Sequence, residues 1–462
     1  MTAPNHYQAI VIGSGQGGNP LCGALAKAGL RTALIERGHI GGTCVNEGCT
    51  PTKTMLASGR VAYLARRGKD YGVLTGDIRI DMQRVRQRKR EIVDSFRNGS
   101  QKRLEKTANL DLIFGEASFT GPKNVSVRMN GGAQRTLSAD RIFINAGARP
   151  SVPKLEGLKD VPFLDSTSIM ELDAVPEHLL VLGGGYVGLE FSQLFRRLGS
   201  RVTIVQTRGQ LLVGEDVDVA EAVLAIVKQE GINVMLSNKA ERVMKSGGGI
   251  QLTVRAGKEL RMVQGSHVLI STGRTPNTDS LNVGAADIAT NERGFIQVNT
   301  KLETNVEGIY ALGDINGGPA FTHISYDDFR ILRTNLIEKG SATTENRFVP
   351  YTLFIDPQLG RVGLTEEQAR SQNRKIRVAK MPMSYVARAL EVDETRGFMK
   401  AIVDAESNQI LGAAVLGIEG GEIMTMLQLA MMGHLPFTAL REATFAHPTL
   451  AESLNNLFTH FA

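Results

Sequence analysis

Apolar runs and glycine turns alternate at the start of the chain. Residues 7–12 form an apolar run of strand length, residues 13–18 contain four glycines, and residues 19–29 have helical spacing before a second apolar run at 31–36. Short buried runs on either side of a glycine turn and a helix are typical of parallel strands joined by a crossover. This order predicts a βαβ unit.

The same order of elements recurs 170 positions later. An apolar strand is predicted at 178–182, a glycine turn at 183–188, a helix up to residue 199 and a second strand at 201–206. Glycines let the backbone approach a pyrophosphate, and the amides and dipole at the helix start favour its negative charge. A glycine-rich turn can also be a plain connection, but its place between a strand and a helix is the context that dinucleotide binding requires. The chain is therefore predicted to be an α/β protein with two Rossmann-like nucleotide-binding units.

The residue at the end of the second strand differs between the two units. Glu36 lies 23 residues after Gly13, where a carboxylate can accept hydrogen bonds from both hydroxyls of an adenosine ribose. Gln206 has the equivalent place 23 residues after Gly183, and Arg208 follows two positions later. The first unit is thus predicted to hold the unphosphorylated ribose of FAD, and the second to prefer the 2′-phosphate of NADPH. The alternative for the second unit is that Gln206 hydrogen-bonds NADH and Arg208 is a solvated side chain.

Composition and charge indicate an ordinary globular protein of about three domains. The chain has 462 residues, of which 42% are hydrophobic and 22% charged, and no apolar run reaches the roughly 20 residues of a membrane span. The 53 Lys and Arg exceed the 47 Asp and Glu, which permits anionic ligands without indicating a nucleic-acid binder. Residues 81–106 carry part of this charge and are predicted to form a long solvated helix. The N-terminus has no signal-peptide pattern, so we expect a soluble, cytoplasmic protein that binds neither membrane nor nucleic acid.

Two of the three cysteines lie close together in the sequence. Cys44 and Cys49 are separated by four residues, and a helical stretch that follows them would place Cys49 near a helix N-terminus. The helix dipole lowers a thiol pKa at such a place and makes the thiol a better nucleophile. The spacing alone leaves two interpretations open, a redox-active pair or two buried structural cysteines. Cys22, on the first predicted helix, is expected to be buried and inert.

A histidine near the C-terminus has a carboxylate close to it in the sequence. His447 precedes Pro448, a favourable first residue of a helix, and Glu452 follows about one turn later. A carboxylate can hold one imidazole nitrogen and leave the other free to move a thiol proton. From these residues alone, a plain capping role for His447 is the stronger interpretation.

These motifs, in this order, resemble the FAD-dependent pyridine nucleotide-disulfide oxidoreductases, which include dihydrolipoamide dehydrogenase, glutathione reductase and mercuric reductase. The similarity covers essentially all 462 residues. It rests on both glycine motifs, Gly-Gly-Thr-Cys-x4-Cys-x-Pro-x-Lys at 41–53, Ala-Leu-Gly-Asp at 311–314 and His-Pro-x3-Glu at 447–452. The resemblance implies an FAD domain at 1–150, an NAD(P) domain at 151–275, a second FAD segment at 276–347 and an α+β dimerisation domain at 348–462.

The resemblance also implies roles for the reactive side chains. Cys49 would lie next to the flavin, and Cys44 would be the exposed interchange thiol that meets the acceptor. Lys53 would lie near flavin N5 with Glu190 as its partner. These roles require the cysteines to be a redox pair.

The resemblance further implies a homodimer in which His447 and Glu452 of one subunit act on the cysteines of the other. FAD and NAD(P)H are the implied cofactors, and no resident metal site is expected. The residues expected to bind FAD are Gly13, Gly15, Gly18, Glu36, Gly42, Thr43, Lys53, Gly147, Gly313 and Asp314. Those expected to bind NAD(P)H are Gly183, Gly185, Gly188, Gln206, Arg208 and Gly273.

Departures from the family bear on the electron acceptor. Dihydrolipoamide dehydrogenases usually have His-Ala-His-Pro at the C-terminal site, whereas this chain has Phe445 two residues before His447. Mercuric reductases usually end in a cysteine pair, and this sequence ends without one. The chain most resembles the short mercuric-reductase-like branch that includes the reactive-chlorine-resistance flavoprotein, on residues 48–54, 321–328 and 452–455.

We therefore expect an NAD(P)H-dependent reductase of a soft metal ion, mercury(II) or copper(II), or of a small disulfide. The alternatives are dihydrolipoamide dehydrogenase and a flavin-based redox sensor with little turnover. Met424 and Met431 lie seven residues apart on a predicted helix, which is typical of a core stripe rather than a copper path.

Overall fold

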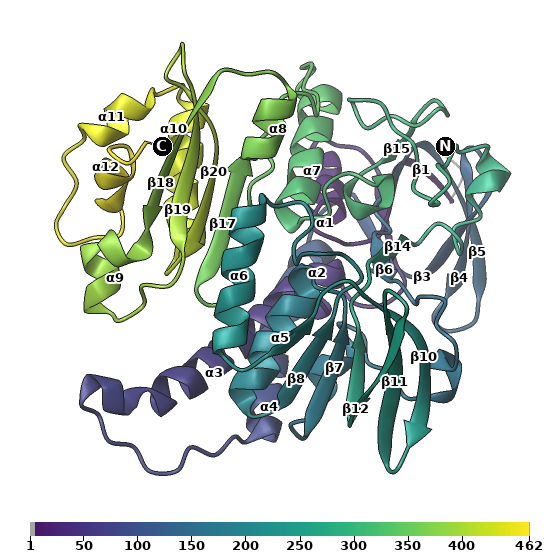
Figure 1. Cartoon of the computed structure of the whole chain (residues 1–462). Helices are drawn as coiled ribbons and strands as arrows, with labels where there is room; N and C mark the ends of the chain where they lie inside the picture. The colour runs from purple at the N-terminus through teal and green to yellow at the C-terminus, as the bar shows by residue number, and fades with distance from the viewer. Residues whose placement is uncertain (1–4, 462) are drawn as a thin grey trace. The chain divides into compact units, whose positions relative to one another are not determined.

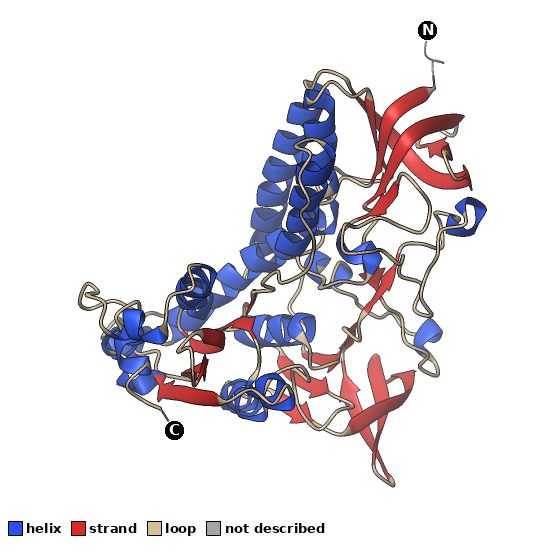
Figure 2. Ribbon diagram, turned by 90° about the horizontal axis from the view of Figure 1, so that it is seen from above, coloured by secondary structure: helices blue, strands red, loops and turns tan. Residues whose placement is uncertain are grey.

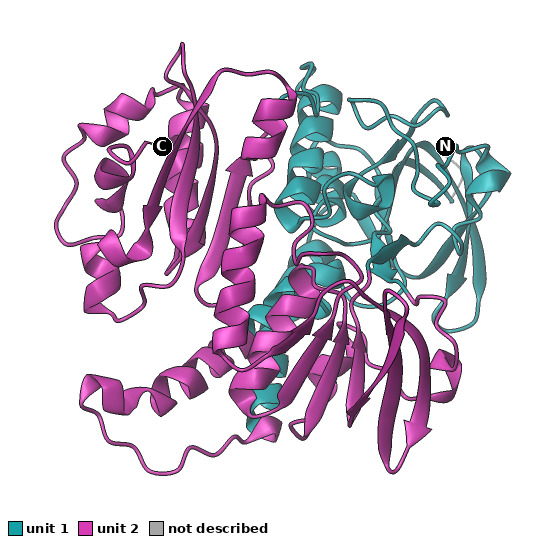
Figure 3. Ribbon diagram, viewed as in Figure 1, with its two compact units in different colours: residues 1–54, 84–151, 273–347 teal, residues 55–83, 152–272, 348–462 magenta. Residues whose placement is uncertain are grey.

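The computed structural model describes residues 5–461, which divide into two compact units. Unit 1 consists of residues 1–54, 84–151 and 273–347 (Figure 3). Unit 2 consists of residues 55–83, 152–272 and 348–462. Each unit is assembled from three stretches of chain, so residues far apart in the sequence pack against one another.

Unit 1 is built on a six-stranded sheet in which β1 pairs in parallel with both β2 and β5, and β4 joins β3 to β5 by antiparallel pairing. Helix α1 (Gly18–Lys27) connects β1 to β2, which confirms the first predicted βαβ unit. The strands are β1 (His6–Ile12), β2 (Thr32–Glu36), β3 (Leu110–Gly121), β4 (Asn124–Met129), β5 (Gln134–Ile144) and β15 (Ile309–Ala311).

Both faces of this sheet are buried. Val11 of β1 packs in one core with Leu21 of α1 and Leu332 of α7 (Thr322–Leu336), whereas Ile10 packs in the core on the opposite face. Figure 2 shows helices lying beside the sheet that starts at the N-terminus. Burial on both faces explains why β1 is a nearly continuous apolar run. Cys22 lies fully buried in the first of these cores, as expected, and burial raises the pKa of its thiol to about 12.

The long solvated helix predicted over 81–106 is confirmed as α4 (Met82–Glu105). Unit 1 also contains a short ribbon in which β6 (Ala148–Pro150) pairs in antiparallel fashion with β14 (Arg274–Pro276). The chain leaves unit 1 just after β6 and returns just before β14. The ribbon therefore holds together the two places where the chain leaves unit 1 and comes back to it.

Unit 2 holds a parallel sheet in the order β13-β7-β8-β9, an antiparallel sheet β10-β11-β12 and an antiparallel sheet β16-β17-β20-β19-β18 (Figure 1). In the parallel sheet, α5 follows β7 and leads to β8, which confirms the second predicted βαβ unit. The elements of the first two sheets are β7 (His178–Leu182), α5 (Tyr186–Leu198), β8 (Arg201–Val205), α6 (Val217–Gln229), β9 (Asn233–Met235), β10 (Asn238–Ser246), β11 (Gly249–Ala256), β12 (Glu259–Gly265) and β13 (His267–Ile270).

The third sheet and its helices form the C-terminal part of unit 2. Met424 and Met431, on α10, are 3% and 5% exposed and share a core with buried side chains of the sheet, which confirms the predicted stripe. The elements are β16 (Tyr351–Leu353), β17 (Gln358–Gly363), α8 (Glu366–Ser371), β18 (Ile376–Pro382), α9 (Ala387–Glu391), β19 (Phe398–Asp404), β20 (Ile410–Gly417), α10 (Gly420–Met432), α11 (Phe437–Arg441) and α12 (Ser453–Leu457). The fold class is thus the predicted one, α/β with two Rossmann-like units and an α+β C-terminal part.

The prediction that Pro448 begins a helix is wrong. Residues 448–452 form turns, and α12 begins at Ser453. Thr449 explains the difference, because its hydroxyl donates to the carbonyl of Ala446 and accepts the N–H of Glu452. Such local side-chain hydrogen bonds compete with helix formation.

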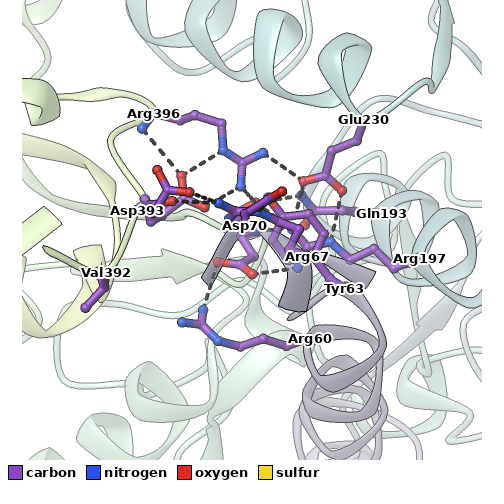
Figure 4. A network of polar contacts seen from close by, with 12 residues as sticks. Arg60, Tyr63, Arg67, Asp70, Gln193, Arg197, Glu230, Val392, Asp393 and Arg396 are labelled. Carbon is purple, nitrogen blue, oxygen red and sulfur yellow. Dashed lines mark hydrogen bonds and ion pairs between the residues drawn. The ribbon is translucent and has the colours of Figure 1, made fainter. Parts of the chain in front are cut away.

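A network of charged side chains lies inside unit 2, where the end of α3 (Cys49–Arg66) meets α5 (Figure 4). Arg197 donates to Glu230 at 2.7 Å and to Asp356 at 2.6 Å, and Arg396 pairs with Glu230 at 2.9 Å. The guanidinium of Arg197 also lies 3.8 Å from the ring centroid of Tyr63. Because these groups are largely buried, the loss of one charge would leave its partners uncompensated.

Candidate active site

The first glycine turn packs tightly against Asn145. Gly13 has a φ of 98°, and a Cβ on it would lie 2.3 Å from the carbonyl oxygen of Asn145. A Cβ on Gly15 would lie 2.9 Å from the Asn145 amide oxygen, and one on Gly18 would lie 2.1 Å from the carbonyl oxygen of Gly13. Helix α1 begins at Gly18 without a side-chain cap. These three positions therefore admit only glycine, and the start of α1 presents the positive end of its helix dipole to an anionic ligand.

A second turn lies against the first one. Gly42 begins α2 (Gly42–Asn46) with a φ of 62°, and a Cβ on it would lie 2.7 Å from the Cα of Gly15. Thr43, the next residue, is exposed. The two predicted FAD-binding stretches are thus adjacent within unit 1.

Glu36 ends β2 beside the glycine turn and is 9% exposed. One carboxylate oxygen accepts the backbone N–H of Ser14 at 2.9 Å and its hydroxyl at 2.7 Å. The other oxygen accepts the N–H of Gly38 at 2.8 Å. The carboxylate is therefore fixed at the strand end, where the sequence predicted a ribose partner.

Asn145 and Asp328 are site residues that the sequence analysis did not assign. The Asn145 side chain accepts the N–H of Gly18 at 2.9 Å and donates to the carbonyl of Leu312 at 2.8 Å. Asp328, on α7, accepts the N–H of Gly313 at 2.8 Å. They join the first glycine turn to the second predicted FAD segment. Asn145 directly follows an apolar strand, and that position is the only sequence signal for its role.

Asp314 follows β15, in the first turn of a short 3₁₀ helix, as predicted for a polar residue after an apolar strand. Its carboxylate lies 3.6 Å from the Arg274 guanidinium. Burial raises the pKa of Asp314, and the nearby Arg274 opposes this shift. Gly147 and Gly273, both at positive φ, flank the strands of the β6–β14 ribbon in the same unit.

The two predicted redox cysteines lie on adjacent helices, Cys44 on α2 and Cys49 as the first residue of α3. Both are thiols, and the Sγ of Cys49 lies 3.3 Å from the hydroxyl of Thr322. A hydrogen bond with Cys49 and, second, burial raise the pKa of Cys44, while the Thr322 hydroxyl opposes this. The structure thus brings the pair together, but Cys49 is exposed and Cys44 half-buried. The expectation that Cys44 is the exposed thiol is not met in this structure.

The second glycine turn repeats the geometry of the first. Gly183 has a φ of 110°, and a Cβ on it would lie 2.5 Å from the carbonyl oxygen of Ser271. A Cβ on Gly188 would lie 2.1 Å from the carbonyl oxygen of Gly183, whereas one on Gly185 would meet open space. Gly185 precedes the first residue of the 13-residue helix α5, which has no side-chain cap. The start of α5 presents the positive end of its helix dipole to a second anionic ligand.

Gln206 and Arg208 lie beyond the end of β8. The Gln206 amide donates to the carbonyl of Gln210 at 3.0 Å, which turns it toward its own loop. Arg208 is exposed, and its guanidinium has no charged or hydrogen-bonding partner within residues 5–461. An exposed guanidinium of this kind can bind a phosphate group through two hydrogen bonds.

Lys53 and Glu190 lie on helices of different units. Lys53 is in the second turn of α3, and Glu190 is on α5, 5% exposed. A Glu190 carboxylate oxygen accepts the N–H of Phe354 at 2.9 Å. Their predicted pairing stays a prediction.

His447 and Glu452 form the predicted pair in unit 2. The Nδ1 of His447 lies 3.0 and 2.9 Å from the two carboxylate oxygens of Glu452. The His447 side chain is 67% exposed. Because Nδ1 is held by the carboxylate, Nε2 is the nitrogen left for proton transfer. Phe445 stands where dihydrolipoamide dehydrogenases usually have a histidine, and it packs against the C-terminal core.

Comparisons with known proteins agree with this architecture. Residues 7–328 match the model of the pyridine nucleotide-disulphide oxidoreductase family, and residues 349–458 match the dimerisation domain of that family. The chain is 39% identical over 459 residues to the probable pyridine nucleotide-disulfide oxidoreductase RclA of Escherichia coli (strain K12), covering 98% of this chain and 99% of the relative. It is 34% identical over 450 residues to a mercuric reductase of Lysinibacillus sphaericus, covering 97% and 82%. The structure of the Cu(II) complex of the HOCl-induced flavoprotein disulfide reductase RclA from Escherichia coli has a TM-score of 0.90 at 38% identity, covering 98% and 99%.

The chain belongs to the pyridine nucleotide-disulphide oxidoreductase family. It is a flavoprotein oxidoreductase, related to mercuric reductases, and its dimerisation domain indicates a homodimer. The predicted family is confirmed. Within residues 5–461, no helix is both long and apolar enough to cross a membrane.

Proposed function

We propose that the protein passes electrons from NADPH through FAD to the Cys44–Cys49 pair, and from there to a soft metal ion or a small disulfide. The single observation that carries this proposal is the cysteine pair itself. The nearness of Cys49 is the main cause that raises the pKa of Cys44, and Cys49 stands at the start of an 18-residue helix. A helix start favours the thiolate that both electron transfer and metal binding require.

The residues of unit 1 fit FAD. The turns at Gly13 and Gly42 are packed so closely that no side chain fits, and the positive end of the α1 dipole suits a pyrophosphate. Glu36 would accept the ribose hydroxyls, and the partly buried Asp314 carboxylate would accept a hydroxyl of the ribityl chain. When bound, FAD supplies the two-electron relay between a pyridine nucleotide and a dithiol.

The residues around the second turn fit a pyridine nucleotide. Gly183, Gly185 and Gly188 would cradle its pyrophosphate at the start of α5. The exposed Arg208 guanidinium supports NADPH over NADH, because a 2′-phosphate would give it a charge-assisted hydrogen bond. We assign the second unit to NADPH on this ground.

The acceptor step is a two-electron oxidation of the dithiol. The two thiolates of Cys44 and Cys49 give up two electrons and join as a disulfide, after their two protons have left. A disulfide acceptor takes both electrons and two protons, mercury(II) takes both electrons, and two copper(II) ions take one each. His447, oriented by Glu452, would accept a thiol proton at Nε2, in the other subunit of the homodimer.

The names of the relatives support the choice of acceptors. One relative is called a mercuric reductase, and the structure with a TM-score of 0.90 is titled a Cu(II) complex of a disulfide reductase. We also propose that the four sequence regions act as predicted, 1–150 and 276–347 with FAD, 151–275 with NADPH and 348–462 in the dimer. We also propose that the protein acts in the cytoplasm, where NADPH is available.

The test is anaerobic oxidation of NADPH by purified holoenzyme with mercury(II), copper(II) or oxidised lipoamide as acceptor. We expect turnover with a metal ion, and loss of that turnover in Cys44→Ser. Cys22→Ala is the matched control, because it removes a buried thiol from the same unit. Lipoamide turnover with inert metals would overturn the metal assignment in favour of a dihydrolipoamide dehydrogenase. Full turnover in Cys44→Ser would overturn the thiol relay.

A further inference from the structure

The five-residue helix α2, which carries Cys44, has little stability of its own. It begins at Gly42 without a side-chain cap. An isolated helix needs about 12–15 residues before it is even marginally stable in water, because its first turn fixes several residues for one hydrogen bond. The place of Cys44 relative to Cys49, the first residue of α3, must therefore depend on contacts that α2 makes with other parts of unit 1.

Asn46, the last residue of α2, makes such contacts. Its amide nitrogen Nδ2 donates to the carbonyl oxygens of Gly42 at 2.9 Å and Ile40 at 3.1 Å. Its amide oxygen Oδ1 accepts the Nε–H of Arg97 at 2.7 Å. Carbonyls on one side and a guanidinium on the other leave the amide a single orientation. The side chain thus ties the end of α2 back to its start, and joins the whole turn to α4, the helix of Arg97.

Arg97 is itself held in place. Its side chain is 23% exposed, and its Nη1 lies 3.3 Å from a carboxylate oxygen of Asp94, one turn earlier on α4. The 24-residue helix α4 is packed on the protein through buried side chains such as Val93 and Leu104. A short hydrogen bond from a charged donor is stronger than one between neutral groups. The bond from Arg97 therefore gives the α2 turn a strong contact with a well-packed helix.

A second arginine of α4 reaches the helix that carries the other cysteine. The Nη1 of Arg88 donates to the carbonyl oxygen of Thr54 at 2.9 Å, in the second turn of α3. Arg88 and Arg97 thus connect one helix to both helices that carry the redox cysteines. Helix α4 is therefore a common support for the Cys44 turn and for the start of α3.

We propose that Arg97 and Asn46 are positioning residues that hold the Cys44 turn close to Cys49 and thereby favour the disulfide over the dithiol. This inference rests on the proposed function, in which the two cysteines exchange electrons. Two thiols held close together lose less conformational entropy when they join than two thiols on a loose turn. Loss of the contact between Arg97 and Asn46 should therefore make the disulfide easier to reduce.

The experiment equilibrates holoenzyme anaerobically with oxidised and reduced dithiothreitol, and counts the thiols of Cys44 and Cys49 by alkylation and mass spectrometry. In this exchange, the two cysteines lose two electrons and two protons and form one S–S bond. Cyclic oxidised dithiothreitol takes up both electrons and both protons and opens to its dithiol. For Arg97→Met we expect the equilibrium constant of disulfide formation to fall about tenfold, which corresponds to a reduction potential roughly 30 mV higher for a two-electron couple.

Two further variants show whether the effect belongs to this contact. Arg97→Lys keeps a charged donor and should retain part of the parent equilibrium constant. Arg103→Met is the matched control, because Arg103 is an exposed arginine of the same helix whose guanidinium donates to Ser100 on that helix. In an Asn46→Ala background, Arg97→Met should change the equilibrium constant no further, since the acceptor of its hydrogen bond is gone.

The reactivity of Cys44 distinguishes positioning from a general loss of stability. A loosened α2 turn exposes the half-buried Cys44 thiol and weakens the interaction with Cys49 that raises the pKa of Cys44. Both changes act in the same direction, so reduced Arg97→Met should be alkylated at Cys44 about three- to tenfold faster than the parent enzyme at neutral pH. The measurement is made well below the unfolding midpoint of the variant.

An unchanged redox equilibrium and an unchanged alkylation rate in Arg97→Met would overturn the inference, and normal reduction of the Cys44–Cys49 disulfide by NADPH in the parent enzyme would leave the proposed function intact. Equal changes in Arg97→Met and Arg103→Met would also overturn the inference. A parent holoenzyme whose disulfide neither NADPH nor NADH reduces would instead overturn the proposed function. If Arg97→Met does not fold, Arg97→Lys carries the same test, with a change in the same direction and of smaller size.

Discussion

Cys49 is the first residue of α3, and its Sγ lies 3.3 Å from the Oγ1 of Thr322, the first residue of α7. The starts of two helices, with 18 and 15 residues, therefore meet at one thiol. Both helix dipoles favour negative charge at that point. The helix starts thus favour negative charge at Cys49, whereas a hydrogen bond with Cys49 and burial raise the pKa of Cys44.

Removal of the Thr322 hydroxyl should slow the reaction of the reduced thiols. The hydroxyl opposes the raised pKa of Cys44, so Thr322→Val should raise that pKa further and shift the pH dependence of alkylation upward. A lost hydrogen bond to a charged group is worth about 1.5 kcal/mol, which corresponds to roughly tenfold slower alkylation by iodoacetamide at neutral pH. Thr322→Ser retains the hydroxyl and should react like the parent enzyme. Equal rates in Thr322→Val and Thr322→Ser would contradict this account.

The C-terminal pair should affect the acceptor step and leave flavin reduction unchanged. Loss of a positioned acid-base group typically costs about 10²- to 10⁴-fold, so His447→Gln should lower disulfide turnover by that factor. Glu452→Gln should cost less, on the order of tenfold, because the amide can still orient Nδ1. Stopped-flow flavin reduction by NADPH serves as the internal control. A similar loss in both half-reactions would exclude a role confined to the acceptor.

Arg208 should set the choice of nucleotide. Arg208→Gln removes an exposed guanidinium that has no partner within residues 5–461, so the preference for NADPH over NADH should fall by roughly ten- to a hundredfold, with kcat/KM for NADH almost unchanged. Arg201→Gln is the control, since Arg201 starts β8 but pairs with Glu177 on the surface. An unchanged preference in Arg208→Gln would favour the alternative that Gln206 simply hydrogen-bonds NADH.

The charged network of Figure 4 should contribute to stability in a way that surface pairs do not. Arg197→Met leaves Glu230 and Asp356 without a buried counter-charge and should destabilise the protein by about 3–5 kcal/mol. Arg201→Met breaks the exposed pair with Glu177 and should cost less than about 1 kcal/mol. Midpoints of denaturant unfolding measure both. An equal loss of unfolding free energy in Arg197→Met and Arg201→Met would contradict a special role for burial of the network.

Glu215 should make stability depend on pH. Burial raises the pKa of Glu215 in the folded protein to about 7, above the ordinary value of 4.5, so its ionisation disfavours the folded state. The stabilising contribution of the neutral Glu215 carboxyl is fully present below about pH 4.5 and is lost as the pH rises through 7. The stability of the parent protein relative to Glu215→Gln should therefore fall by roughly 2–3 kcal/mol between pH 5 and 8. Unfolding midpoints across this range test the sign, and a constant difference would contradict the shifted pKa.

Local sequence patterns predict much of this fold and little of its long-range pairing. Both βαβ units follow from apolar runs around glycine turns, because the backbone packing at Gly13 and Gly183 demands glycine. The contact of Asn145 with Gly18 joins residues 127 positions apart, and no local periodicity encodes it. The Tyr351–Glu215 bond spans 136 positions and is equally hidden.

In the candidate site, too, local spacing predicts some features, and long-range contacts determine the others. The pairing of His447 with Glu452 was predicted from five residues of spacing, although the local conformation is a turn rather than a helix, because Thr449 hydrogen-bonds its neighbours. The exposure of Cys44 and Cys49 could not be predicted from spacing, since it depends on long-range packing such as the contact of Cys49 with Thr322, 273 positions away.

An anaerobic titration of oxidised holoenzyme with NADPH tests the central claim most directly, because it counts the electrons that the protein stores. If Cys44 and Cys49 form a redox pair behind the flavin, the parent enzyme will take up about twice as many electrons per flavin as Cys44→Ser or Cys49→Ser. Thiol counting before and after the titration should show two new thiols in the parent enzyme alone. Equal uptake in all three proteins, with no new thiols, would contradict the thiol relay.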